Sequence, residues 1–301
     1  MKKIVNIASI VLIGFSSCKA QQAEKKAVPA FPSFSTEAHR GGRGLLPENT
    51  IVAMKKAIDL GVTTLEMDTH ITKDGEVVVT HDDYLSPGFM LTPDGKEIPK
   101  EDAKKYAVYQ MNYSALKKFD IGTKFHTGFP KQEKVKTYIP KLEELIDSVQ
   151  AYLKSSNKKQ TFYNIETKSS DKGDNILHPD PETFVKLLVD VLDRKGITPY
   201  CVIQSFDKRT LQVLNAKYPH IRTSFLISNK KTFEENMQDL GFTPFILSPE
   251  YKLVDEALVK KCHERGIKII PWTPNTAAEI AKLKELKVDG IITDYPNLFL
   301  P

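Results

Sequence analysis

The feature that most constrains the fold of this 301-residue chain is a regular alternation of strand-like and helix-like segments after Pro140. Short runs rich in β-branched and aromatic residues, typical of strands, alternate with stretches that place apolar residues at helical spacing. The expected strands are 162–166, 200–205, 222–227, 245–247, 268–272 and 290–293. The expected helices are 142–153, 181–195, 208–218, 233–240, 254–265 and 277–286. Because parallel strands need crossover connections, usually helices, the alternation predicts an α/β fold with a parallel sheet.

The first half of the chain adds three strand-like runs, at 35–39, 65–68 and 76–80. About eight repeats of strand and helix predict a closed (β/α)8 barrel of the TIM type. Since there are nine candidate strands, one of them should lie outside the barrel, and the sequence does not say which. The turn at Asp74-Gly75 leaves too little chain for a helix between the second and third runs. Residues 84–138, after the third strand, form a stretch too long for an ordinary loop. We expect an excursion over one end of the barrel that walls a pocket.

Residues 1–17 are excluded from the fold because they have the pattern of an export signal. Lys2 and Lys3 precede the apolar run 4–15, and small residues then lead to Cys18. The run is too short to span a bilayer comfortably. The pattern resembles a bacterial lipoprotein signal, in which Cys18 becomes the lipidated first residue of the mature protein.

This resemblance predicts an exported lipoprotein of the cell envelope, associated with a membrane through lipidated Cys18 and exposed at the periplasmic or outer-membrane face. Residues 18–34 are short, polar and Pro-containing, and we expect them to be a tether. Residues 35–301 would form the barrel domain. The alternative is ordinary secretion with cleavage near Ala20, which gives a soluble periplasmic or secreted protein.

Composition excludes some partners. The net charge is +5, and acidic and basic residues are interspersed without a basic block that carries aromatics. We therefore expect no binding to nucleic acid. Cys201 and Cys262 show no metal-ligand spacing, and the sequence leaves open whether they pair.

The first cluster of candidate functional residues is acidic. Glu66 and Asp68 stand two apart on an expected strand, so both carboxylates point to the same face. Glu166 ends another expected strand. Catalytic groups of such barrels gather where the carboxyl ends of the strands meet. Three carboxylates there predict a site for one hard divalent cation, Ca²⁺ or Mg²⁺.

Basic residues at the same strand ends complete a coherent set. His39 and His81 suit an acid and a base that exchange protons near neutral pH. Arg40 and Lys168 suit an anion, and a phosphodiester beside a metal ion is the expected ligand.

The sequence says less about the roles of other residues near these strand ends. Trp272 also ends an expected strand. Asn49 and Thr50 are interpreted as the start of a helix, whereas Glu48 is equally consistent with a helix start and with substrate binding. We expect His70 to lie beyond the end of its strand and to point away from the site, and we assign it no role.

The motifs occur as an ordered set: His39-Arg40-Gly41, Pro47-Glu48-Asn49-Thr50, Glu66-x-Asp68, Thr72-Lys73-Asp74-Gly75, His81-Asp82, Asn164-Ile165-Glu166-x-Lys168, Ser205-Phe206, Trp272-Thr273 and Asp289-Gly290-Ile291-Ile292-Thr293-Asp294. In this order they resemble the glycerophosphodiester phosphodiesterase family, from about residue 35 to the end of the chain.

The resemblance implies a metal-dependent barrel enzyme that cleaves small glycerophosphodiesters to glycerol 3-phosphate and an alcohol. It implies that one divalent cation is held by three carboxylates, those of Glu66, Asp68 and Glu166. The acid and base would be His39 and His81. The substrate-binding candidates are Arg40 and Lys168 for the phosphate, Trp272 for the glycerol, and Glu48. One route has a neighbouring glycerol hydroxyl attack phosphorus, giving a cyclic phosphate that water opens.

Two alternatives remain. A phosphodiesterase of the lysophospholipase D type would keep the chemistry and act on lipids, with the excursion 84–138 shaping an acyl groove. A non-catalytic lipoprotein that binds phosphorylated headgroups would lack a catalytic residue, and none is visibly missing. The sequence leaves open the headgroup, the choice between Ca²⁺ and Mg²⁺, and the oligomeric state.

Overall fold

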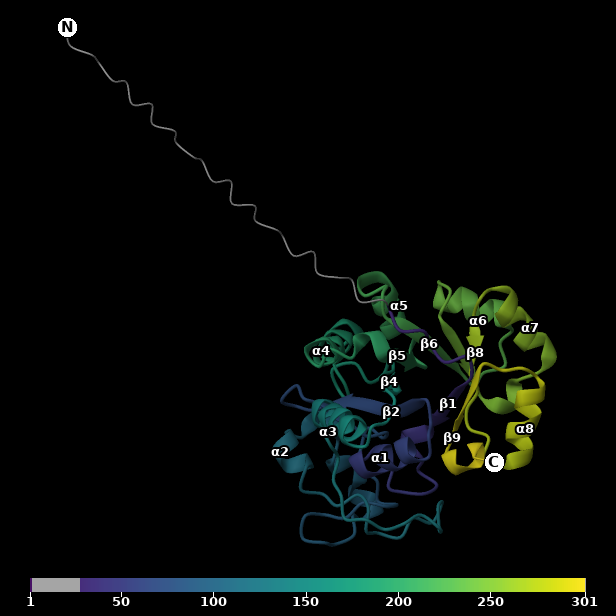
Figure 1. Ribbon diagram of the computed structural model, residues 1–301. Helices are drawn as coiled ribbons and strands as arrows, with labels where there is room; N and C mark the ends of the chain where they lie inside the picture. The colour runs from purple at the N-terminus through teal and green to yellow at the C-terminus, as the bar shows by residue number, and fades with distance from the viewer. Residues whose placement is uncertain (2–27, 301) are drawn as a thin grey trace.

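The computed structural model describes residue 1 and residues 28–300, and in this part of the chain eight parallel strands form a barrel (Figure 1). The barrel strands are β1 (Ser35–Ala38), β2 (Thr64–Ile71), β4 (Phe162–Thr167), β5 (Cys201–Ser205), β6 (Arg222–Ile227), β7 (Ile246–Pro249), β8 (Lys268–Ile269) and β9 (Gly290–Thr293). Neighbours follow chain order, and β9 pairs with β1. Backbone hydrogen bonds from Asp289 to Ile269 (2.9 Å) and from Ile292 to Pro271 (3.0 Å) join β8 to β9. The predicted (β/α)8 barrel is confirmed.

The strand outside the barrel is β3 (Val77–Val79), the third in the chain. It pairs with β2 in antiparallel fashion, with Ile71 opposite Val77. The connection between the two strands is too short for a crossover helix, so only a hairpin can join them. The same pairing extends β2 to Ile71, three residues past its expected end.

Helices cover the barrel on the outside (Figure 1). They are α1 (Ile51–Asp59), α3 (Leu142–Ser155), α4 (Pro181–Arg194), α5 (Lys208–Lys217), α6 (Phe233–Leu240), α7 (Glu256–Glu264) and α8 (Ala277–Glu285). Capping boxes at Thr232 and Thr276 set the starts of α6 and α8. In each, the threonine hydroxyl accepts from the backbone amide of the glutamate three residues later, and the glutamate carboxylate accepts from the backbone amide of the threonine. The helix and strand bounds lie within two residues of expectation except at the ends of β2 and β8. At β8, Pro271 has no amide hydrogen with which to extend the ladder.

The barrel strands separate an apolar outer layer from a polar interior. Leu65 and Met67 of β2 point outward into the core between strands and helices. Glu66 and Asp68 alternate with them and are buried on the inner side. The period of two along β2 therefore turns both carboxylates into the barrel.

The last residues of the expected tether contact the barrel. The ring of Phe31 lies 5.2 Å from that of Phe162 and 5.3 Å from that of Phe245, both near the amino ends of their strands. Phe31 thereby covers the apolar floor of the barrel, formed by Val202, Ile246, Ile270 and Ile292. The chain thus enters the barrel at the end opposite to the strand ends that carry the candidate site.

The excursion between β3 and α3 is a compact addition with its own core, drawn in blue to teal along the lower edge of Figure 1. It contains the short helices η2 (Lys100–Lys105), η3 (Val108–Gln110) and α2 (Tyr113–Leu116). Its core is built from Val78, Leu85, Met90, Ile98, Val108, Tyr113, Leu116, Phe119, Ile121 and Ile139. A backbone bond from Glu133 to Leu45 (2.9 Å) and a side-chain bond from Gln132 to the Arg43 carbonyl (2.7 Å) attach it to the loop after β1.

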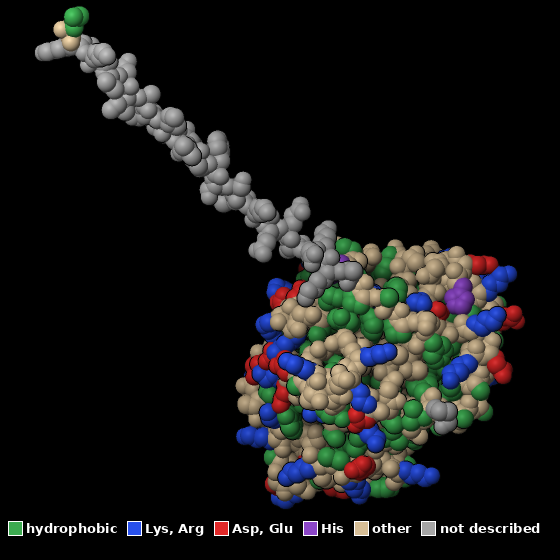
Figure 2. Space-filling model, viewed as in Figure 1, with side chains coloured by type: hydrophobic (Ala, Val, Ile, Leu, Met, Phe, Trp, Pro, Cys, Tyr) green, Lys and Arg blue, Asp and Glu red, His purple; other side chains and the backbone are tan. Residues whose placement is uncertain are grey.

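On the face shown in Figure 2, lysine and arginine side chains are interspersed with aspartate and glutamate. Cys201 and Cys262 are buried free thiols. Within residues 28–300, none of the helices combines the length and apolar composition that a membrane span requires. The expected export signal, apart from Met1, and the expected lipidation site Cys18 lie outside the described residues.

Candidate active site

Three buried carboxylates meet at the carboxyl ends of β2 and β4. Asp68 and Glu166 are direct neighbours in the parallel register, and Glu66 precedes Asp68 on the same face. One oxygen of each carboxylate lies within 4.8 Å of the other two. Glu66 and Asp68 are each 1% exposed and Glu166 is 6% exposed, so bulk water does little to screen their mutual repulsion.

Neutral donors hold two of these carboxylates in place. Glu66 accepts from the Arg40 amide (2.6 Å) and from Nε2 of Gln204 (2.7 Å). Asp68 accepts from Nδ2 of Asn49 (2.9 Å). Asn49 has a φ of 59°, in the left-handed region that asparagine tolerates better than most residues.

The electrostatics of the three carboxylates fit a divalent cation. Burial and the charge of Asp68 raise the pKa of Glu66 well above its ordinary value. Burial also acts to raise the pKa of Asp68, but Arg40 and neighbouring basic groups hold it below its ordinary value. Oδ1 of Asp68 is buried without a hydrogen-bond partner, which leaves a ligand oxygen available for a hard cation.

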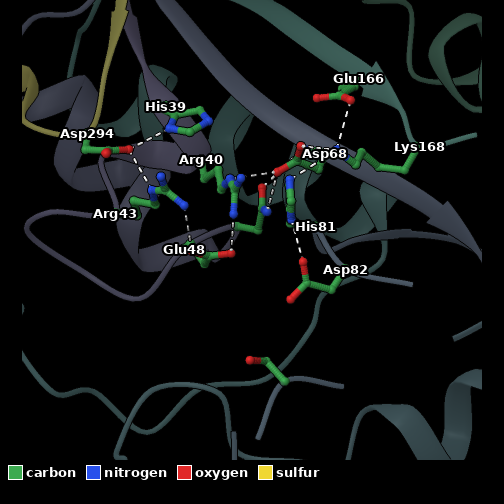
Figure 3. Close-up of polar contacts among 12 residues, drawn as sticks. His39, Arg40, Arg43, Glu48, Asp68, His81, Asp82, Glu166, Lys168 and Asp294 are labelled. Atoms are coloured by element: carbon green, nitrogen blue, oxygen red, sulfur yellow. Dashed lines mark hydrogen bonds and ion pairs between the residues drawn. The ribbon is translucent and has the colours of Figure 1, made fainter. Parts of the chain in front are cut away.

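His39 follows β1 and is oriented by a carboxylate from the other end of the chain (Figure 3). Its Nδ1 lies 2.5 Å from Oδ1 of Asp294, which also accepts from Nε of Arg43 (2.7 Å). Burial lowers the pKa of His39, although Asp294 opposes the shift. The neutral ring therefore donates Nδ1–H to Asp294, and Nε2 is left with a free lone pair.

His81 follows β3 and lies between a carboxylate and an ammonium group (Figure 3). Its Nδ1 lies 2.6 Å from Oδ1 of Asp82, and its Nε2 lies 3.1 Å from Nζ of Lys168.

The backbone carbonyl of His81 lies 3.0 Å from Nε2 of His70. His70 lies within β2, and not beyond its end as expected, because the hairpin with β3 extends that strand. Burial lowers the pKa of His70 to about 4, so it is a neutral donor to the loop that carries His81.

The cationic side chains neutralise part of the acidic cluster. Lys168 Nζ lies 2.9 Å from Oε1 of Glu166, and Arg40 Nε lies 3.2 Å from Oδ2 of Asp68. Arg40 Nη1 lies 2.9 Å from Oε1 of Glu48. Glu48 does not line the cavity, so its carboxylate positions the Arg40 guanidinium and does not face the cavity itself.

A cavity of about 120 Å³ opens among these groups. His39, His81, Arg40 and Lys168 line it together with Glu66 and Glu166. Its apolar wall consists of Phe206, Leu226, Trp272 and Ile292. The rings of Phe206 and Trp272 meet edge to face at 5.5 Å, and Nε1 of Trp272 donates to the Ser248 carbonyl (3.0 Å).

The structure thus brings together at one end of the barrel the residues predicted from the sequence. It adds three that the sequence analysis did not select, Asn49, Gln204 and Arg43, and it gives a contact to Asp294, which the sequence analysis named only as the end of the last motif. Thr50 caps α1 by accepting from the Ala53 amide, as expected, whereas Asn49 serves the site. Gln204 had a usable signal, because it is a polar residue that follows the apolar run Cys201–Ile203 on an expected strand.

A (β/α)8 barrel that gathers two imidazoles, two cationic side chains and three carboxylates around one end of its strands has the residue types that hydrolysis of a phosphate ester uses. Residues 39–298 match the model of the glycerophosphoryl diester phosphodiesterase family. The chain belongs to that family and is a phosphoric diester hydrolase.

Known proteins similar to this chain agree with the assignment. The glycerophosphodiester phosphodiesterase of Bacillus subtilis (strain 168) is 27% identical over 304 residues, which cover 97% of this chain and 94% of that protein. The glycerophosphodiester phosphodiesterase of Caldanaerobacter subterraneus subsp. tengcongensis is 29% identical over 263 residues, which cover 87% of this chain and 95% of that protein. A crystal structure from Silicibacter pomeroyi DSS-3 superposes with a TM-score of 0.78 at 26% identity, covering 90% of this chain and 93% of that one.

Proposed function

We propose that the enzyme hydrolyses glycerophosphodiesters to glycerol 3-phosphate and an alcohol with the help of one divalent cation, and that His39 and His81 exchange protons during the reaction. The observation that supports this is a single cavity lined by both histidines and by carboxylates of the acidic cluster. Each histidine has its Nδ1 against an aspartate, which is Asp294 for His39 and Asp82 for His81. Both rings therefore direct Nε2 away from that partner.

The charges of the site suit a phosphodiester anion. When ionised, Glu66, Asp68 and Glu166 carry three negative charges, against two positive charges on Arg40 and Lys168. A divalent cation would change this surplus of one negative charge into one positive charge. The cation would be held by the three carboxylates, and when bound it would stabilise the negative charge that develops on the phosphoryl oxygens.

The first half of the reaction uses His39 as base and His81 as acid. Nε2 of His39 takes the proton from the glycerol hydroxyl next to the ester, and that oxygen attacks phosphorus. Once the Lys168 ammonium pairs with the phosphate, Nε2 of His81 is free to carry a proton. The bond from phosphorus to the other alcohol breaks as protonated His81 gives its Nε2 proton to the leaving oxygen. The products are a cyclic glycerol phosphate and the free alcohol, with His39 protonated and His81 neutral.

The second half reverses these roles. Nε2 of His81 takes a proton from water, whose oxygen attacks phosphorus and opens the ring. The released glycerol oxygen takes the proton from His39. Glycerol 3-phosphate is formed, and both histidines return to their starting states, as a paired acid and base require.

The direct test is hydrolysis of glycerophosphocholine with and without a chelator. We expect activity with Ca²⁺ or Mg²⁺, loss in saturating EDTA, and recovery when the cation is restored. Glu166→Gln should abolish turnover with the circular dichroism spectrum unchanged, because it removes a ligand charge at constant volume. The control is Glu97→Gln, which removes the same charge from an exposed position on the excursion. Full activity in saturating EDTA would contradict the metal assignment.

We also propose that Cys18 is lipidated and anchors the enzyme in the cell envelope, on the strength of the pattern in residues 1–17. Cys18→Ala should then move the enzyme from the membrane fraction to a soluble fraction or leave it unprocessed. A wild-type enzyme that is already in the soluble fraction, with no change in Cys18→Ala, would favour cleavage near Ala20. A chain that begins at residue 28 retains Phe31 on the barrel floor and should keep full turnover.

A further inference from the structure

We propose that a groove beyond His81 binds the alcohol part of the substrate and selects an alcohol that carries an ammonium group, such as choline or ethanolamine. The inference rests on the proposed hydrolysis of glycerophosphodiesters, and it names the class of diester that this chain prefers.

The groove has a volume of about 360 Å³ and continues the catalytic cavity. His81, Glu166, Lys168 and Phe206 line both spaces. Away from the cavity, the groove is lined by Asp82, Asp83, Tyr84, Ser169, Ser170 and His178. A group that leaves phosphorus beside His81 therefore has a formed space in which to lie.

The geometry of displacement at phosphorus assigns the two halves of the substrate. The attacking and leaving oxygens lie roughly in line, on opposite sides of phosphorus. Trp272, Leu226 and Ile292 line the cavity but not the groove, and this apolar wall suits the glycerol that supplies the attacking hydroxyl. The leaving oxygen then faces the opposite side, where His81 protonates it and the groove begins.

The groove carries two carboxylates: that of Asp82 lies 2.6 Å from Nδ1 of His81, whereas that of Asp83 has no close cationic partner among the described residues. The side chains of Asp82 and Asp83 are 47% and 42% exposed. Over residues 28–300, neither carboxylate has a lysine or arginine nitrogen within 4.0 Å. Within the same residues, the ion-pair contact of Asp83 is Nδ1 of His70, at the long distance of 3.9 Å. Lys168, which also lines the groove, is already paired with Glu166.

Aromatic side chains beside these carboxylates favour an ammonium group over a simple metal ion. Tyr84 lines the groove next to the acidic pair, and Phe206 is 44% exposed at the junction with the cavity. Ammonium groups, and quaternary ones above all, are attracted to aromatic faces. The excursion fixes the acidic pair, because the Asp83 carbonyl accepts from the Val108 amide (2.9 Å) and the Leu85 amide donates to the Tyr106 carbonyl (3.0 Å).

The test compares two diesters that differ in one charge. They are glycerophosphocholine and the glycerophosphodiester of 3,3-dimethylbutan-1-ol, in which a carbon replaces the choline nitrogen. The wild-type enzyme should prefer the choline diester in kcat/KM by about tenfold. Asp83→Asn should reduce this preference by about threefold or more. Asp94→Asn removes the same charge from the excursion outside the groove and should leave the preference unchanged.

A second measurement reports binding without turnover. Free choline should inhibit the wild-type enzyme more strongly than 3,3-dimethylbutan-1-ol does, and Asp83→Asn should reduce this difference. Equal kcat/KM for the two diesters, or a preference that survives Asp83→Asn, would overturn the assignment of the groove while hydrolysis itself stands. If neither diester is cleaved in the presence of Ca²⁺ or Mg²⁺, the proposed function fails and the inference fails with it.

Discussion

Oδ1 of Asp294 lies 2.5 Å from Nδ1 of His39, although 255 residues separate the two in the chain. The contact follows from the closure of the barrel. β1 and β9 are adjacent parallel strands, with Ala38 opposite Thr293, so the residues that follow them meet at the carboxyl end. The carboxylate fixes the tautomer of the imidazole, and the catalytic role proposed for His39 depends on it.

Asp294→Asn should therefore reduce kcat by about 10²-fold or more with a small change in KM, because the amide no longer enforces donation from Nδ1. Steady-state kinetics on glycerophosphocholine measure both constants. Asp255→Asn is a matched control, since asparagine also caps a helix and Asp255 caps α7 away from the cavity. An Asp294→Asn variant with wild-type kcat would show that the carboxylate has no part in orienting His39.

The two histidines should behave as a unit. His39→Ala and His81→Ala should each lower kcat by at least about 10²-fold, the usual scale for a general acid or base. The double variant should be little slower than either single variant, because losing one partner already disables the proton exchange. Single-turnover kinetics test this directly. Multiplicative losses in the double variant would mean that the two residues act independently.

Asn49 should control the affinity for the cation. Its side chain holds Asp68, while its backbone has a φ of 59°. Asn49→Gly removes the amide but tolerates that backbone conformation, so it isolates the hydrogen bond. We expect the affinity for Ca²⁺ or Mg²⁺, measured by calorimetry, to fall about 10- to 100-fold. An unchanged affinity would mean that the bond to Asp68 serves only the fold.

The sequence sufficed for features that depend on periodicity. Alternation along 65–68 places Glu66 and Asp68 on one face whatever the rest of the chain does, and a parallel barrel then brings Glu166 beside them. The identity of the outlying strand was also accessible in principle, since the short connection at Asp74-Gly75 permits only a hairpin.

What the sequence did not yield depends on loop conformation and on barrel closure. Asn49 reaches Asp68 because the loop after β1 contains left-handed residues, with a φ of 52° at Arg40 and 59° at Asn49, and no periodicity encodes such turns. The bond between Asp294 and His39 requires the register between the first and last strands. Gln204 contacts Glu66 across β4, a relationship between non-adjacent strands that only the curvature of the barrel creates.

The buried carboxylate of Glu37 should make stability depend on pH. Glu37 lies inside the barrel and accepts from Nδ2 of Asn164 (2.8 Å) and from Oγ of Ser35 (2.9 Å). Burial raises the pKa of Glu37 from an ordinary 4.5 to about 7. The folded protein therefore binds this proton more tightly than the unfolded chain, and the stability it provides is lost as pH rises from about 4.5 to about 7.

Glu37→Gln removes that titration and keeps the volume. The free energy of unfolding of the variant, relative to wild type, should increase between about pH 5 and about pH 8 by at most about 3 kcal/mol. Urea unfolding at the two pH values measures it. A difference between variant and wild type that stays constant with pH would show that Glu37 does not ionise in this range.

The size of the site should make the enzyme prefer water-soluble diesters to lysophospholipids. The cavity is about 120 Å³, and the large apolar side chains of the excursion are used in its own core, among them Leu85, Met90 and Leu116. An acyl chain gains about 0.8 kcal/mol for each CH₂ that is buried, and it needs a continuous apolar groove to gain it. The groove beyond His81 has two aromatic side chains, Tyr84 and Phe206, but they lie among carboxylates, serines and a lysine.

We therefore expect glycerophosphocholine and glycerophosphoethanolamine to be cleaved with a higher kcat/KM than the matching lysophospholipids, and no large decrease in KM when an acyl chain is added. The lysolipid must be assayed below its critical micelle concentration, so that aggregation does not imitate weak binding. A lysolipid preferred by more than about tenfold, which corresponds to about 1.4 kcal/mol of transition-state binding, would favour an enzyme of the lysophospholipase D type. Such a preference would also require an acyl site outside the cavity and groove described above, because neither has the continuous apolar lining that an acyl chain needs.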